Sequence, residues 1–147
     1  MACTLRFVGP DDPLFADASA LRYETLHRPL GLSPDTDWDD ADPSARHLIV
    51  LDDDSVLAYG RLIMSAGSAQ IRHVAVAASE RGRGLGRQIV EGLVAQARRE
   101  GRAMVWANAR FTALGFWRGM GFSDADDGLI EAEDTHVPHK RMELRLR

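Results

Sequence analysis

The chain has 147 residues, of which 45% are hydrophobic, and a formal net charge of −4. This length suits one domain over 1–147, and the negative balance argues against general nucleic-acid binding, although arginines are dense over 81–102. The single Cys3 excludes a disulfide framework, and no Cys/His cluster has zinc-ligand spacing. The sequence shows neither a signal peptide nor an apolar run near the roughly 18 residues of a membrane span. We therefore expect a cytoplasmic protein without metal or membrane contact.

The first part of the chain predicts a strand, a helix and an acidic loop. Residues 4–9 form a short strand, and residues 13–28 carry apolar side chains at helical spacing. The loop over 31–44 either attracts a cationic amine, together with Glu24 of the helix, or is simply a solvated acidic surface. Its Trp38 is either a lid over the substrate or the apolar anchor of the loop. The aspartates concerned are Asp37, Asp39, Asp40 and Asp42.

Three apolar segments with short turns come next, and they predict an antiparallel meander. After them, an apolar face of Leu85, Ile89, Leu93, Val94 and Ala97 indicates a helix over 84–100. A following strand at 103–107 completes a βαβ unit, so the two strands that flank this helix should be parallel. The fold class expected is therefore α/β (α+β), with a mixed, mostly antiparallel central sheet flanked by helices. The remaining predicted elements are strands at 46–52, 55–64, 69–77 and 138–147, a helix at 109–119 and an acidic loop at 123–136.

The segment between the third meander strand and this helix is rich in arginine and glycine. Residues 81–87 read Arg-Gly-Arg-Gly-Leu-Gly-Arg at a predicted helix start, where free amides and the helix dipole favour a phosphate group. The dinucleotide pattern G-x-G-x-x-G fails, because Arg87 or Ile89 takes the third glycine place. No Walker sequence is present either.

What the loop does match is R/Q-x-x-G-x-G/A, through Arg81, Gly84 and Gly86, after the strand that carries Val74 and Val76. This resembles the pyrophosphate motif of the GCN5-related N-acetyltransferases (GNAT family), and the element order agrees over nearly the whole chain. The resemblance implies an acetyltransferase with acetyl-CoA as co-substrate. Backbone groups of Val74 and Val76 would meet the pantetheine arm, and the loop amides would hold the pyrophosphate. The cofactor-binding residues that it implies are Val74, Val76, Arg81, Gly82, Arg83, Gly84, Leu85, Gly86, Arg87, Asn108, Phe116 and Trp117.

A second segment supports the resemblance. Residues 113–122 look like the family's A-x-x-F-Y-x-x-x-G-F segment, in which the Tyr commonly protonates the departing thiolate. Trp117 occupies that position here, and an indole N–H is not a usable acid, so the general acid is missing or comes from elsewhere. Asn108 is similar to the Asn that bonds the pantetheine arm. Residues 21–32 resemble a first-helix segment found in a branch of small bacterial GNAT proteins, and the ending Val137-Pro138-His139 resembles that of the ElaA-type group within this branch.

Two histidines are the candidate catalytic residues. His73 directly precedes Val74 and should face away from the core, where a neutral imidazole could act as the base or simply be a structural histidine. His139, with His136 nearby, could replace the absent acid or orient the substrate, and its alternative is a plain turn residue. His47 and Tyr23 could each line the acceptor side, but both are expected to be structural.

The acceptor would be a primary amine of a small molecule or a peptide amino group, attacked through a ternary complex. Two alternatives remain open: a CoA-binding sensor that has lost catalysis, and an acyltransferase with a longer donor, similar to the acyl-homoserine-lactone synthases. The sequence does not fix the oligomeric state, and a homodimer is one expectation.

Overall fold

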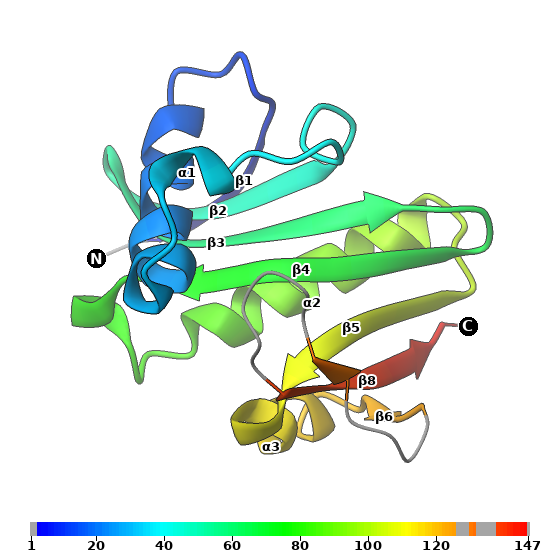
Figure 1. Cartoon of the computed structure of the whole chain (residues 1–147). Helices are drawn as coiled ribbons and strands as arrows, with labels where there is room; N and C mark the ends of the chain where they lie inside the picture. The colour runs from blue at the N-terminus through cyan, green and yellow to red at the C-terminus, as the bar shows by residue number, and fades with distance from the viewer. Residues whose placement is uncertain (1–2, 126–129, 132–137, 147) are drawn as a thin grey trace.

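A computed structural model describes residues 3–125, 130–131 and 138–146. Within this part of the chain, eight strands form one sheet in the order β1-β2-β3-β4-β5-β8-β6, with β7 paired to β8 (Figure 1). The mixed sheet that the sequence predicts is thereby confirmed. The strands are β1 (Thr4–Val8), β2 (Arg46–Asp52), β3 (Ser55–Met64), β4 (Ser68–Val76), β5 (Met104–Arg110), β6 (Ser123–Asp124), β7 (Ile130–Glu131) and β8 (Pro138–Arg145).

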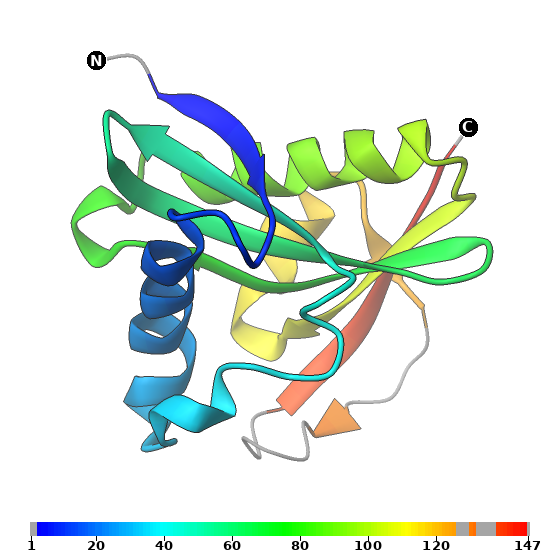
Figure 2. The ribbon, with the colours of Figure 1, turned by 90° about the horizontal axis from the view of Figure 1, so that it is seen from above.

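The helices cover the two faces of the sheet. Figures 1 and 2 show α2 (Leu85–Arg99) along one face and α1 (Phe15–Arg22) on the other. The apolar face predicted for α2 is confirmed, since Leu85, Ile89, Leu93 and Ala97 are buried in the larger core cluster. A smaller cluster lies beneath α1 and includes Phe15, Ala18, Ile49 and Tyr59. α3 (Leu114–Arg118) packs beside β5 and completes the α2 side.

The predicted meander and the predicted parallel pair are both confirmed. β2, β3 and β4 pair in antiparallel order, and β4 pairs with β5 in parallel. The α2 helix makes the crossover between these two strands, as a βαβ unit requires.

Two predicted helices differ from the structure. The helix expected over 13–28 is α1 followed by a π-helical turn, Tyr23–His27, and a 3-10 turn, Arg28–Leu30, that contains Pro29. The helix expected from residue 109 begins later, because β5 continues to Arg110 by pairing with β8, and a 3-10 turn (Phe111–Ala113) then leads into α3. In both cases the segment pairs with, or packs against, residues that lie far away in the sequence. Of the acidic loop expected over 123–136, residues 126–129 and 132–137, including His136, lie outside the described residues.

Candidate active site

The sheet opens between β4 and β5. These strands pair only at Ser68–Met104, Ala69–Val105 and Gln70–Trp106. Beyond Gln70, β4 continues to Val76 beside β3, while β5 continues to Arg110 beside β8. The two strands therefore diverge toward their C-terminal ends (Figure 1). The carboxyl ends of parallel strands are where open α/β sheets bind their ligands.

A β-bulge in β4 marks the start of this opening. Tyr59 pairs with Ala75 but Arg61 pairs with Arg72, so β4 carries one more residue than β3 between the two pairs. His73 lies in this interval with a φ of 63°, a left-handed value that is uncommon for a residue other than glycine. A bulge bends its strand and re-aims the side chains around it, and such features are frequent beside active sites.

The glycine-rich loop lies at the N-terminus of α2, next to the opening. Gly82 and Gly84 have φ values of 84° and 77°, which explains why glycine stands at both positions. The first helical hydrogen bond runs from the amide of Gln88 to the carbonyl of Gly84, and no side chain caps the helix. Within the described residues, the amides of 85–87 thus lack a helical acceptor, as expected for a helix start. A Cβ at Gly84 would meet no atom within 4 Å, so open space lies in front of the loop.

The loop contains three arginines, and all of them are exposed. Arg83 pairs with Glu80 at 2.7 Å, and Arg87 approaches Glu91 at 3.6 Å. Exposed pairs of this kind are weak, so an anionic ligand could compete for both guanidinium groups. Arg81 precedes them at the start of the loop. The amides, the helix dipole and these charges together form a site for an anion such as pyrophosphate.

Three of the predicted cofactor residues meet at one wall of the opening. A Cβ on Gly86 would lie 3.5 Å from the ring of Phe116 and 3.5 Å from Val76. Phe116 is 39% exposed. Trp117, its neighbour on α3, is only 7% exposed and packs edge-to-face on Phe122 with 5.1 Å between ring centroids. The indole therefore belongs to the core cluster, and Phe116 is the aromatic residue at the wall.

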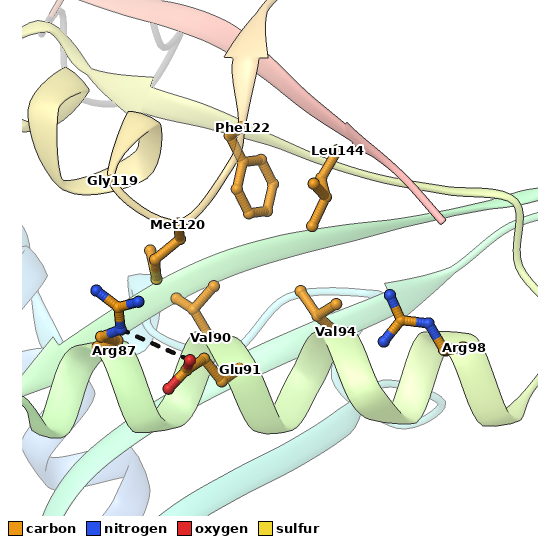
Figure 3. A pocket seen from close by; sticks show the side chains of 9 residues that line it. All are labelled: Arg87, Val90, Glu91, Val94, Arg98, Gly119, Met120, Phe122 and Leu144. Carbon is orange, nitrogen blue, oxygen red and sulfur yellow. Dashed lines mark ion pairs between the residues drawn. The ribbon is translucent and has the colours of Figure 1, made fainter. Parts of the chain in front are cut away.

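A pocket of about 470 Å³ lies between α2 and the segment after α3. Figure 3 shows Val90 and Val94 of α2 pointing toward Met120, Phe122 and Leu144. Charged residues of α2 complete the lining, and Arg87 of the loop is one of them. The pocket thus combines apolar walls with a charged margin that is continuous with the glycine-rich loop. The charged residues are Arg87, Glu91 and Arg98.

His73 faces away from α2, as the sequence predicts. Its ring meets His27 edge-to-face at 5.5 Å, on the side of the sheet that carries α1. The side chain is half-buried, and its Nδ1 atom has no hydrogen-bond partner among the described residues. Burial holds the pKa of His73 well below 6.5, and the charges of Arg61 and Arg72 lower it further. The imidazole is therefore neutral at physiological pH.

His139 and Asn108 lie on the other side of the opening. His139 pairs with Arg110, and Asn108 pairs with Arg141, on neighbouring strands. Because Ala107 and Ala109 are buried toward α2, the side chain of Asn108 projects from the opposite face of the sheet. β5 separates β8 from β4, so the structure does not bring His139 and His73 together.

The aspartates of the acidic loop do not form the solvated surface that the sequence favoured. Asp37 and Asp42 are buried, and they bind the buried guanidinium of Arg22 with N–O distances of 2.8 Å. Asp42 and Asp39 also bind Arg61, at 2.9 and 2.7 Å. Asp40 is exposed. The carboxylates of Asp37, Asp39 and Asp42 are thus neutralised by arginines, so they do not supply the predicted attraction of a cationic substrate.

His47 is structural, as expected. Its Nε2 donates to the carbonyl of Asp42 at 2.9 Å, and its Nδ1 accepts from the hydroxyl of Tyr59 at 2.6 Å. Burial lowers the pKa of His47, which agrees with this neutral tautomer. The sequence-based predictions did not include this charge cluster, which consists of Arg22, Arg61, Asp37, Asp39 and Asp42. The signal that could have found it is an arginine at position 61 in an otherwise apolar strand, because a buried charge needs a partner.

The described residues lack two further kinds of feature. None of their helices is both long and apolar enough to cross a membrane. In the same ranges, no group of three His, Cys, Asp or Glu is placed to hold a metal ion.

Comparison with known proteins places this geometry in a family. The model of the acetyltransferase (GNAT) family matches residues 14–122. An acyl-CoA N-acyltransferase from Pseudomonas aeruginosa aligns with a TM-score of 0.82 at 24% identity, over 97% of this chain and 99% of that one. ElaA from Escherichia coli gives 0.80 at 20% identity, over 97% and 99%.

A third similar structure was solved with a ligand. It is an aminoglycoside 6'-N-acetyltransferase in complex with coenzyme A, with a TM-score of 0.77 at 12% identity, over 97% of this chain and 96% of that one. At these identities the solved structures show a shared fold, and the match to the family model shows the family. Because that match spans the α1 helix, the meander, the glycine-rich loop and α3, the chain belongs to the GNAT family of acetyltransferases.

Proposed function

We propose that this protein transfers an acetyl group from acetyl-CoA to a primary amine of a small molecule or peptide. The observation that carries the proposal is the uncapped glycine-rich loop directly beside the β4–β5 opening. The loop suits a pyrophosphate, and the opening leaves one edge of β4 without a strand partner beyond Gln70 in the described sheet. A ligand with a pyrophosphate and a long polar arm fits both features.

The donor would lie along three parts of this surface. The pyrophosphate binds the amides of 82–87, with Arg81 and Arg83 beside it. The pantetheine arm follows the backbone of β4 at Val74 and Val76, with Asn108 on the opposite strand. Phe116 packs against Gly86 and forms the wall of this path. The adenosine takes the apolar pocket of Figure 3, whose margin contains Arg87.

The reaction would be a direct attack. The amine nitrogen bonds to the thioester carbonyl carbon, the C–S bond breaks, and the CoA thiolate leaves and takes up a proton. A backbone N–H of β4 near Val74–Val76 polarises the carbonyl. His73 takes the proton from the attacking nitrogen, directly or through water. A base of low pKa is sufficient, because that nitrogen becomes acidic once it has attacked the carbonyl.

His139 is the proposed acid or substrate-orienting residue on the far side of the opening. No tyrosine can take this role. Both tyrosines of the chain are engaged elsewhere, since Tyr23 donates to the carbonyl of Leu32 and Tyr59 is buried in the charge cluster. Burial also raises the pKa of Tyr59, which makes it a poorer acid.

The buried indole of Trp117 favours a second candidate function. A protein with the donor site but without the usual acid could bind CoA as a sensor and turn over slowly or not at all. An acyltransferase with a longer acyl donor is the remaining alternative. Its test is the relative rate with acetyl-CoA and with longer acyl-CoA esters.

The deciding experiment measures thiol release from acetyl-CoA against a panel of primary amines, together with CoA binding by calorimetry. We expect CoA binding and amine-dependent thiol release. His73→Asn and His139→Asn should each lower kcat by more than they lower CoA affinity. Asparagine tolerates the positive φ at position 73 better than most residues, which keeps that variant folded. CoA binding without release on any amine would favour the sensor, and no CoA binding would reject both functions.

A further inference from the structure

Arginines gather on the sheet face opposite α2, next to the opening. Arg72 lies on β4, Arg110 on β5 and Arg141 on β8. Arg72 pairs with Arg61, whose side chain binds Asp39 on the α1 side of the sheet, and directly paired residues share a face. Arg72 therefore projects from the α1 side of the sheet.

The same face carries the other two arginines. Val105, Ala107 and Ala109 of β5 are buried toward α2, so Trp106, Asn108 and Arg110 project from the opposite face. Arg141 pairs with Asn108, and its guanidinium stacks on Trp106 at 4.1 Å from the ring centroid. Trp106 in turn pairs with Gln70, two residues before Arg72. Arg72 therefore stands at one side of the opening, and Arg110 and Arg141 stand at the other.

The charges of this face are only partly compensated. Arg72 and Arg110 are exposed, and in the described part of the chain neither has a hydrogen-bond or ion-pair partner. Arg141 has one acidic neighbour, Glu143 at 3.1 Å. In the described part of the chain, the aspartates that hold Arg22 and Arg61 on this side of the sheet are already engaged by those two arginines. Among the described residues, the charges beside His73 are therefore mainly positive, and after burial the charges of Arg61 and Arg72 lower the pKa of that histidine.

We infer that the acceptor is an amine that also carries an anionic oxygen group, a carboxylate or a phosphate, which Arg72 and Arg110 bind. The inference rests on the proposed function, because it assumes that the donor arm enters from the α2 side and the acceptor from the opposite face. Guanidinium groups bind such oxyanions with paired N–H donors. The same field repels polycationic acceptors such as aminoglycosides.

The test compares acceptors in pairs that differ only in the anion. A dipeptide is paired with its C-terminal amide, and phosphoethanolamine is paired with ethanolamine, which separates the carboxylate from the phosphate. In each case thiol release from acetyl-CoA gives kcat/KM. We expect the anionic member of at least one pair to be preferred by about tenfold or more. In Arg72→Gln and Arg110→Gln the preference should fall toward one. Arg99→Gln, an exposed arginine at the far end of α2, should keep it.

The outcomes separate this inference from the function it rests on. Thiol release without a preference for any anionic member, or a preference that survives in both variants, overturns the inference and leaves the acetyltransferase intact. If no amine releases thiol, the transferase proposal fails, and the same pairs are titrated into the CoA-saturated protein by calorimetry. There, tighter binding of an anionic member that is lost in the Arg72→Gln/Arg110→Gln double variant supports the inference. Equal or absent binding of both members contradicts it.

Discussion

Arg22 and Arg61 are fully buried, and the aspartates that hold them come from one loop of the chain. Burial alone would lower the pKa of Arg22, but the hydrogen bonds that its guanidinium donates to Asp37 and Asp42 outweigh burial, and the pKa rises. The same contacts lower the pKa of Asp42 despite its burial. Removing one member of such a cluster leaves an uncompensated charge in the interior, and that is the costly event.

Asp42→Asn should therefore destabilise the fold strongly. The change removes the carboxylate that both buried arginines share, and we expect a loss of about 3–5 kcal/mol in the free energy of unfolding. Denaturant unfolding measures it. The matched control is Asp40→Asn in the same loop, where the side chain is exposed, and a change within about 0.5 kcal/mol is expected there. Similar values for the two variants would disprove the role of the cluster.

His73 makes stability depend on pH. Its pKa lies well below 6.5 in the folded protein, because of burial first and then of Arg61, Arg72, Arg22 and His27. Below pH 6.5 the unfolded chain therefore binds a proton at this residue that the folded chain does not. The free energy of unfolding should consequently fall as the pH is lowered from about 7.5 to about 5.5, by up to about 1.4 kcal/mol per pH unit for this one group.

His73→Asn isolates the contribution of this group, since His47 and the other titratable groups stay in place. Unfolding free energies of both proteins are measured across that pH range. The variant should lose less stability on acidification than the wild type. Parallel curves would show that His73 titrates with an ordinary pKa in the folded state.

At the scale of single elements, long-range pairing explains what the sequence could not predict. The periodic apolar face of α2 and the apolar segments and short turns of the meander are local signals, and both elements lie where they were expected. The extension of β5 to Arg110 depends on β8, which is far away in the chain. No residue pattern in the sequence predicts the π-helical turn at Tyr23–His27 or the bulge at His73.

Gly60 of β3 sets how closely α2 approaches the sheet. A Cβ at this position would lie 2.3 Å from Cγ2 of Ile89 and 3.0 Å from Cδ1 of Leu93. Gly60→Ala should destabilise the protein by about 1–3 kcal/mol, because the core must shift to accept the methyl group. Thermal or denaturant unfolding measures the loss. Gly115→Ala in α3 is the control, since no atom lies within 4 Å there, and it should be neutral or slightly stabilising. Equal behaviour of the two variants would contradict the close packing.

At the scale of the whole molecule, the position of the glycine-rich loop at a helix start could be predicted from the sequence, and the arrangement of the proposed acceptor face could not. The glycine-rich loop is a contiguous motif, and the structure brings Val76, Gly86 and Phe116 together beside it. The proposed acceptor face consists of residues of β4, β5 and β8 on the α1 side of the sheet, and no local sequence pattern reveals that these residues lie together. This is why the acidic loop suggested a cationic substrate, whereas on this face the described exposed side chains of Arg72 and Arg110 are positive.

The central claim is that the amides of the glycine-rich loop bind the pyrophosphate of CoA. Calorimetric titration of CoA into Gly84→Asp and Gly84→Asn tests it most directly. The two side chains are nearly equal in size, and both variants must adopt the same φ of 77° at this position. Both side chains project into the open space in front of the loop. We expect the wild type to bind CoA and the aspartate variant to bind it at least about tenfold more weakly than the asparagine variant, because only the aspartate places a negative charge against the phosphates. Equal affinities of the two variants, or no binding of CoA to the wild type, would contradict it.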